Sequence, residues 1–131
     1  MRPHIAGSAD IDDGSDQAAI SLAAARWNRA VADCSYMRIE VLAPSADARP
    51  GYSSEGGNEN VIYWVESGWL HDPAATGITT INFVDNPSRE DDGRIVDADI
   101  ELNGNFTFGS DTGDDVVDIQ NVLVHELGHV L

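Results

Sequence analysis

Two histidines and a glutamate near the end of the chain have the types and the spacing of a metal site. His125 and His129 are four residues apart, and Glu126 follows the first histidine directly. On a helix this spacing places both imidazoles on one face, one turn apart, where both can reach one metal ion at about 2.0–2.1 Å. Only four histidines occur in the 131 residues. Two of them at ligand spacing favour a metal site over a chance pairing on a solvated helix.

The chemistry that this arrangement could carry out is hydrolysis. A bound zinc ion lowers the pKa of a water molecule toward about 7. The carboxylate of Glu126, at the flank of the histidine face, could accept a proton from that water and later deliver it to a leaving amine. A catalytic zinc usually has three protein ligands, and this segment offers two histidines. A third ligand would therefore have to come from another part of the protein.

The segment that carries these residues, 115–131, is predicted to be a helix that begins near Asp115 or Asp118. Either aspartate can cap a helix N-terminus and interact favourably with the helix dipole. The apolar residues around the histidines predict a helix that is largely buried: Val122, Leu123, Leu127 and Val130. Gly128 costs a helix roughly 1 kcal/mol relative to alanine. Its presence indicates a close approach of the backbone to a neighbouring element, for example a strand.

One helix and four strands are predicted upstream, and they would position the histidine helix. The helix spans 16–34, with Asp16 as its cap and an apolar stripe of Ile20, Ala24, Trp27, Val31 and Cys34. That stripe predicts a buried Cys34. The strands span 36–42, 61–66, 78–84 and 94–102, and the second of them is apolar almost throughout and therefore central. The order predicts an α+β fold with a twisted mixed sheet of about four strands.

Three carboxylates alternate with apolar residues in the last predicted strand. Asp97, Asp99 and Glu101 share one face of it. Like charges on one face repel each other, and a calcium ion would relieve the repulsion, although three residues are fewer than the usual 6–8 oxygen ligands. The alternative is that this face of the strand is exposed to solvent and carries acidic residues simply because the whole chain is acidic. Both interpretations stay open at this point.

Charge and composition exclude several classes of partner. The chain has 7 Lys and Arg against 23 Asp and Glu, for a net charge of −16, which disfavours nucleic acid and anionic membrane surfaces. No apolar run is long enough to span a membrane, and the first residues lack the apolar core of a signal peptide. Residues 1–15 are acidic and contain Gly and Ser, so we expect a loose tail or the remnant of a propeptide. Residues 16–131 are predicted to form one domain.

Several stretches together resemble the catalytic domain of matrixin-type metzincins, the zinc endopeptidases with the motif HExxHxxGxxH. The stretch VLVHELGHVL is similar to their active-site helix. Four stretches of this chain resemble the elements that precede that helix in the family: ARWNRAVADC, NVIYWV, ITTINFV and GRIVDADIELN. The last of them is especially similar to the corresponding segment of bacterial matrixin-like proteases. The resemblance covers about residues 16–131 and implies the upper subdomain of a metzincin-like zincin. It implies zinc held by His125 and His129, with Glu126 as the general base.

The resemblance also implies a substrate, a location and a missing part. The residues that match the edge strand on which a substrate peptide lies extended are Thr79, Thr80, Ile81, Asn82 and Phe83. Ordinary strand residues without this role explain the pattern equally well. The implied protein is a secreted monomer that acts on protein or peptide substrates. The glycine and third histidine of the motif would fall just after Leu131, which implies a catalytic domain truncated at its C-terminus.

Two other functions stay open. The chain could be a non-catalytic acidic module of matrixin-like fold that binds calcium or a protein partner. It could also belong to another HExxH class, whose third ligand is a glutamate on a later helix. For the chain as it stands, two protein ligands predict weak zinc binding and very low activity. We also expect the apolar face of the last helix to lie partly uncovered.

Overall fold

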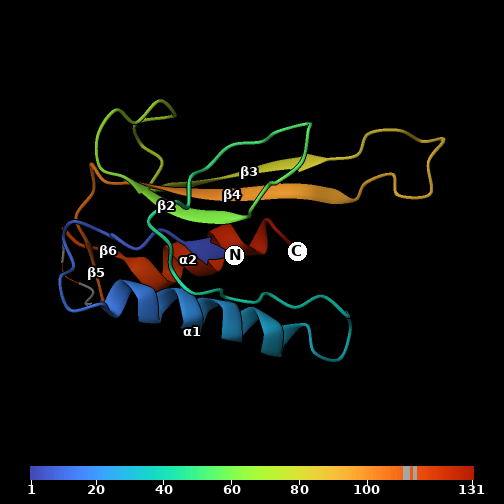
Figure 1. The fold of residues 1–131 in the computed structure, drawn as a ribbon. Helices are drawn as coiled ribbons and strands as arrows, with labels where there is room; N and C mark the ends of the chain where they lie inside the picture. Colours follow the sequence, from blue (N-terminus) through green and yellow to red (C-terminus); the bar gives the residue numbers. More distant parts are fainter. Residues whose placement is uncertain (111–112, 114) are drawn as a thin grey trace.

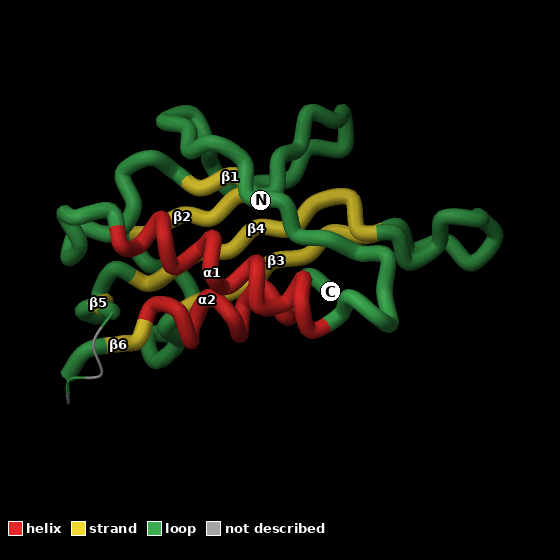
Figure 2. The backbone as a smooth tube through the Cα atoms, turned by 90° about the horizontal axis from the view of Figure 1, so that it is seen from below, coloured by secondary structure: helices red, strands yellow, loops and turns green. Residues whose placement is uncertain are grey.

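Two helices lie side by side on one face of a four-stranded mixed sheet (Figures 1 and 2). The structure, a computed structural model, describes residues 1–110, 113 and 115–131. Long loops cross the opposite face of the sheet (Figure 1). The predicted α+β class is therefore confirmed at this level. In the described residues no helix has both the length and the apolar character needed to cross a membrane.

The sheet has the strand order β1-β2-β4-β3. Its strands are β1 (Arg2–Pro3), β2 (Val61–Val65), β3 (Gly77–Phe83) and β4 (Ile95–Asn103). β2 pairs in parallel with β1 and β4, whereas β3 pairs antiparallel with β4. The apolar β2 is an interior strand, as predicted, and β3 lies at the edge. A separate pair, β5 (Phe108–Gly109) and β6 (Val117–Asp118), leads into the last helix.

The two helices are α1 (Ser15–Ala30) and α2 (Ile119–Gly128). Asp118 caps α2, because its Oδ1 accepts a hydrogen bond from the Asn121 N–H at 3.0 Å. The predicted cap of α1 is wrong. Gly14 occupies that position with φ 77° and no side-chain cap. Asp16 is buried instead, and its Oδ2 accepts a hydrogen bond from the Ser8 N–H at 3.0 Å.

The core lies between the helices and the sheet. It joins residues of both helices to one face of the two interior strands: Ile20, Ala23, Ala24, Ile62, Trp64, Ile100, Leu102, Ile119, Leu123 and Leu127. Val122 and Val124 of α2 are only partly buried, in line with the expectation of a partly uncovered face, but Ile119, Leu123 and Leu127 are fully covered. The reason is that α1 packs along α2 while the sheet covers its other side (Figure 2).

The N-terminal segment differs from its prediction. Residues 1–15 are not a loose tail, because Arg2–Pro3 forms β1 and Pro3 is fully buried. The N-terminal ammonium of Met1 donates to the Glu40 carbonyl at 2.7 Å, and the Leu42 N–H donates to the Met1 carbonyl at 2.9 Å. Two residues are too few to show a periodic pattern, which is why β1 is invisible in the sequence.

Two further predictions near the end of α1 are wrong. Segment 36–42 is not a strand, although Ile39 is buried between the exposed Arg38 and Glu40, as the alternation predicted. It contacts the sheet through a few hydrogen bonds beside β1 and not through a ladder. Cys34 is exposed and not buried. The helix ends at Ala30, so the helical spacing that placed Cys34 on the apolar stripe does not extend to it.

Candidate metal centre

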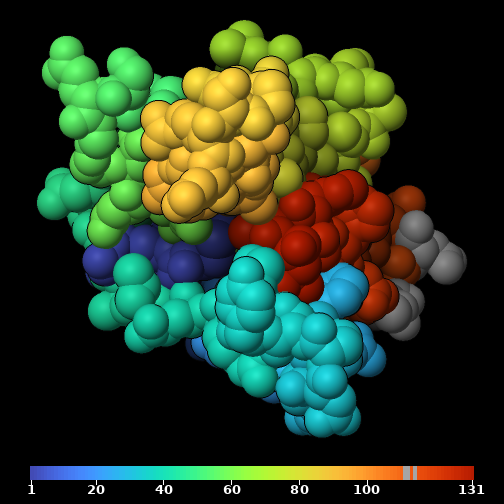
Figure 3. Space-filling view, turned by 90° about the vertical axis from the view of Figure 1, so that its right-hand side faces the viewer, coloured from blue at the N-terminus to red at the C-terminus, as the bar shows by residue number. Residues whose placement is uncertain are grey.

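The imidazoles of His125 and His129 meet at the C-terminal end of α2. Their Nε2 atoms are 3.2 Å apart, the ring centroids are 4.9 Å apart, and the ring planes cross at 81°. His129 directly follows the helix and keeps a right-handed helical conformation, so the one-turn spacing is preserved. Both residues are exposed. This end of the chain reaches the surface beside the β3–β4 connection and the segment that follows α1 (Figure 3).

The separation of the two nitrogen atoms fits two ligands of one zinc ion. With Zn–N bonds of about 2.0–2.1 Å and a tetrahedral angle, two ligand nitrogens lie roughly 3.3 Å apart. The separation here is 3.2 Å. A hydrogen bond between two neutral imidazoles, with one ring donating and the other accepting, fits the same distance. In either case the two side chains converge on one point in front of the helix.

Trp27 of α1 holds this end of α2 in place. Its Nε1–H donates a hydrogen bond to the Val124 carbonyl at 2.6 Å. A Cβ atom at Gly128 would lie 2.8 Å from Cζ2 of the indole ring, closer than side-chain atoms normally approach. The close approach predicted from Gly128 therefore exists. The neighbouring element is the helix α1 and not a strand.

Glu126 points away from the histidines' exposed side, toward the sheet. The residue is buried, with 6% of its surface exposed. The Thr79 hydroxyl donates to Oε2 at 2.7 Å and also lies 3.0 Å from the Glu126 carbonyl oxygen. Oε1 accepts no hydrogen bond from any described residue. The carboxylate is thus tied to the edge strand through one oxygen, and the other oxygen is available as a proton acceptor.

The five residues predicted to contact a substrate divide between the two faces of β3. β4 lies on one side of β3, and in the described part of the chain no strand lies on the other. Thr79 faces α2, whereas Asn82 faces away from it and donates to Asp97 Oδ2 at 3.2 Å. Thr80 lines a cavity of about 200 Å³ on that second face, Ile81 is partly exposed, and Phe83 is 57% exposed. Binding of a peptide at this edge stays a prediction.

The acidic face of β4 is not solvated, which corrects the simpler interpretation. Asp97 is fully buried and Asp99 is 3% exposed, because residues 43–60 cross this face. Asp99 accepts the Gly51 N–H at 2.6 Å and the Val61 N–H at 2.9 Å. Burial raises the pKa of Asp99 above its ordinary value, although these two hydrogen bonds oppose the shift.

Asp97 and Glu101 have different surroundings. Asp97 Oδ1 is buried without a hydrogen-bond partner among the described residues. Glu101 Oε2 lies 3.3 Å from His71 Nε2. The two residues are 30 positions apart, so no local sequence pattern predicts this contact. Within residues 1–110, 113 and 115–131, no three His, Cys, Asp or Glu side chains gather as a metal-binding group. Calcium at this strand stays a prediction.

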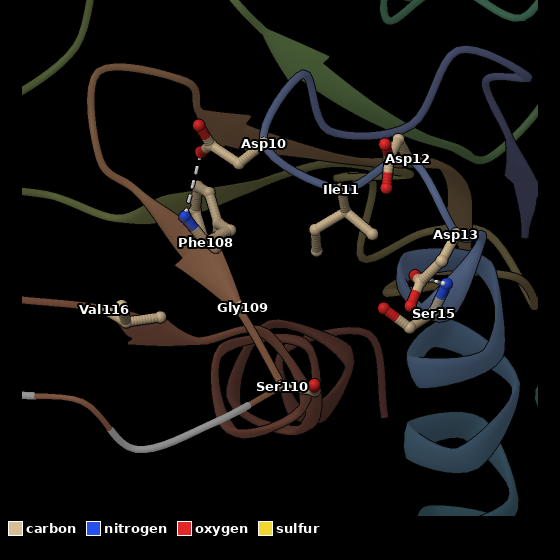
Figure 4. A pocket seen from close by; sticks show the side chains of 9 residues that line it. All are labelled: Asp10, Ile11, Asp12, Asp13, Ser15, Phe108, Gly109, Ser110 and Val116. Atoms are coloured by element: carbon tan, nitrogen blue, oxygen red, sulfur yellow. Dashed lines mark hydrogen bonds between the residues drawn. The ribbon is translucent and has the colours of Figure 1, made fainter.

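A separate cavity of about 280 Å³ lies between the loop before α1 and strand β5 (Figure 4). Asp10, Asp12 and Asp13 contribute to its lining. Asp10 Oδ2 accepts the Phe108 N–H at 3.0 Å, and Asp13 Oδ1 accepts the Ser15 N–H at 2.9 Å. Two of these carboxylates therefore have structural partners. The cavity contains none of the residues of the HELGH segment.

Comparisons with known proteins leave the site to be interpreted from its own geometry. No protein-family model matches the chain, and no match was found among curated proteins or among solved structures. The resemblance to metzincins therefore stays a prediction that rests on the residues quoted for it.

Proposed function

We propose that this protein is the zinc-binding, catalytic part of a matrixin-type metalloendopeptidase. His125 and His129 supply two zinc ligands, and Glu126 acts as the general base. The observation that carries the proposal is the 3.2 Å separation of the two Nε2 atoms, with a carboxylate on the adjacent residue. The metzincin-like arrangement and a secreted location belong to the same proposal and rest on the resemblance.

Each residue has a distinct role in the hydrolysis of a peptide bond. When bound, zinc polarises the substrate carbonyl and lowers the pKa of water. Glu126 Oε1 accepts a proton from the water that attacks the carbonyl carbon. The same proton then passes to the nitrogen of the leaving amine as the C–N bond breaks. The free edge of β3, along Gly77–Phe83, pairs with the backbone of an extended substrate.

The test is zinc-dependent cleavage of quenched fluorogenic peptides at high enzyme concentration, because two histidine ligands predict a very low activity. Glu126→Gln is the decisive variant. Loss of general-base catalysis is worth about 10²–10⁴ in rate, so we expect the cleavage rate to fall by at least about a hundredfold. Glu90→Gln is the matched control, because Glu90 is exposed on the β3–β4 connection. We expect it to cleave at the wild-type rate. Equal rates for Glu126→Gln and wild type would refute the proposed role.

A second function, an acidic module that binds calcium without turnover, is favoured by one observation. Asp97 Oδ1 is buried without a partner among the described residues, on a strand that also carries Asp99 and Glu101. A cation bound there would satisfy this oxygen. A melting temperature that rises with calcium in the wild type but not in Asp97→Asn, together with no peptide cleavage, would favour this function over the protease.

A further inference from the structure

Two residues of the edge strand form a cradle around the carboxylate of Glu126. Gly77 and Thr79 are two positions apart on β3, so they share the face that α2 covers. They pair with Leu102 and Ile100 of β4, which are fully buried. The cradle is therefore built on a strand that is held in register by the sheet.

Thr79 fixes one carboxylate oxygen. Its hydroxyl donates to Oε2 at 2.7 Å and lies 3.0 Å from the backbone carbonyl oxygen of Glu126. Hydrogen bonds to an ionised carboxylate are stronger than bonds between neutral groups. No other described residue donates to this carboxylate, so Thr79 is the contact that selects the orientation of the side chain.

Gly77 provides the space for the other oxygen. A Cβ atom at this position would lie 3.2 Å from both Cγ and Oε1 of Glu126 and 3.0 Å from Cδ2 of Leu102. Each distance is tighter than an ordinary van der Waals contact. A side chain at position 77 would therefore require the Glu126 and Leu102 side chains to shift by a few tenths of an ångström.

We propose that Gly77 and Thr79 are positioning residues for Glu126, which leave Oε1 as the atom that accepts the proton. The expected effect of this positioning on catalysis rests on the proposed protease function. The positioning role adds to the substrate contact predicted for Thr79, because the Thr79 side chain turns toward α2 and holds the base, while the strand backbone remains free for a substrate. Geometric precision of this kind affects kcat, since a base must lie within hydrogen-bond reach of the proton it abstracts.

The experiment measures the Glu126 side chain directly and the reaction separately. Three-bond NMR couplings from Cγ of Glu126 to its backbone nitrogen and carbonyl carbon report how many χ1 rotamers the side chain occupies. The variants are Thr79→Val, which removes only the hydroxyl, Thr79→Ser, which restores it, and Gly77→Ala. Thr80→Val is the matched control, because Thr80 is on the same strand but faces the acidic side. Circular dichroism establishes that each variant is folded.

We expect wild type, Thr79→Ser and Thr80→Val to show one rotamer. Thr79→Val should show averaged couplings, and Gly77→Ala should show a displaced or averaged side chain. In the peptide cleavage assay, Thr79→Val should lower kcat about tenfold or more with little change in KM, and Thr79→Ser should recover most of it.

The outcomes separate the two proposals. Wild-type couplings in both Thr79→Val and Gly77→Ala would overturn the positioning role, whatever the activity. Averaged couplings in Thr79→Val, with equal zinc-dependent cleavage by wild type and Glu126→Gln, would support the positioning contact and overturn the protease function. Averaged couplings in Thr79→Val with an unchanged kcat would show that Thr79 orients Glu126 without affecting catalysis, and would overturn that part of the proposal.

Discussion

Replacement of Gly128 by alanine tests how α1 holds the histidine helix. Alanine is favoured over glycine inside a helix by about 1 kcal/mol. The added Cβ, however, would lie 2.8 Å from Cζ2 and 3.4 Å from Cε2 of Trp27. Overpacking of this kind costs about 1–3 kcal/mol. The two terms together predict that Gly128→Ala lowers the free energy of unfolding by about 0–2 kcal/mol, instead of raising it by about 1 kcal/mol.

A double-mutant cycle with Trp27→Phe isolates the contact. Phenylalanine lacks the indole atoms that the alanine would meet, so Gly128→Ala should become stabilising in that background. The cycle should give a coupling energy of about 1–3 kcal/mol, above the roughly 0.3–0.5 kcal/mol scatter of independent sites. The assay is urea unfolding followed by far-ultraviolet circular dichroism, with unchanged m-values as the sign of an unchanged folded state. A Gly128→Ala variant that is about 1 kcal/mol more stable in the wild-type background would refute the contact.

The remaining predictions concern other parts of the fold and the metal centre. Asp118→Ala should lower the free energy of unfolding by about 1 kcal/mol through loss of the α2 cap, measured by urea unfolding. Because burial raises the pKa of Asp99, the folded state binds more protons than the unfolded state. The free energy of unfolding of the wild type relative to Asp99→Asn should therefore fall as pH rises from about 3.9 through the raised pKa, and a flat difference would contradict it. Cys34 should react with Ellman's reagent in the folded protein, since it is exposed. Zinc binding by this chain should be weak and should be abolished by His129→Ala, measured by calorimetric titration.

The sequence predicts the elements that have a clear period and a clear boundary. The alternation in β4 correctly places Ala98, Ile100 and Leu102 together on one buried face, although the face of Asp97 and Asp99 is buried as well. The spacing in the last helix correctly brings the two histidines together, and Asp118 is one of the two predicted caps. These predictions succeed because periodicity and capping are local properties of the chain.

The predictions that fail depend on the path of loops. The acidic face of β4 is buried because residues 43–60 fold over it, and no local pattern specifies that path. The contact between Thr79 and Glu126 joins residues 47 positions apart, and each has an ordinary strand or helix role on its own. Gly77 gives no signal either, because its importance comes from the side chain that lies against it.

The most direct test of the proposed zinc site is a zinc titration of the ¹⁵N-histidine-labelled protein, followed through the imidazole nitrogen signals. We expect the Nε2 signals of His125 and His129 to shift together with one binding isotherm, while those of His4 and His71 do not move. Glu126→Gln should leave these shifts in place and remove peptide cleavage. Nε2 signals of His125 and His129 that stay unchanged at saturating zinc would contradict the central claim, and the pair would then be a hydrogen-bonded pair of histidines on the surface of α2.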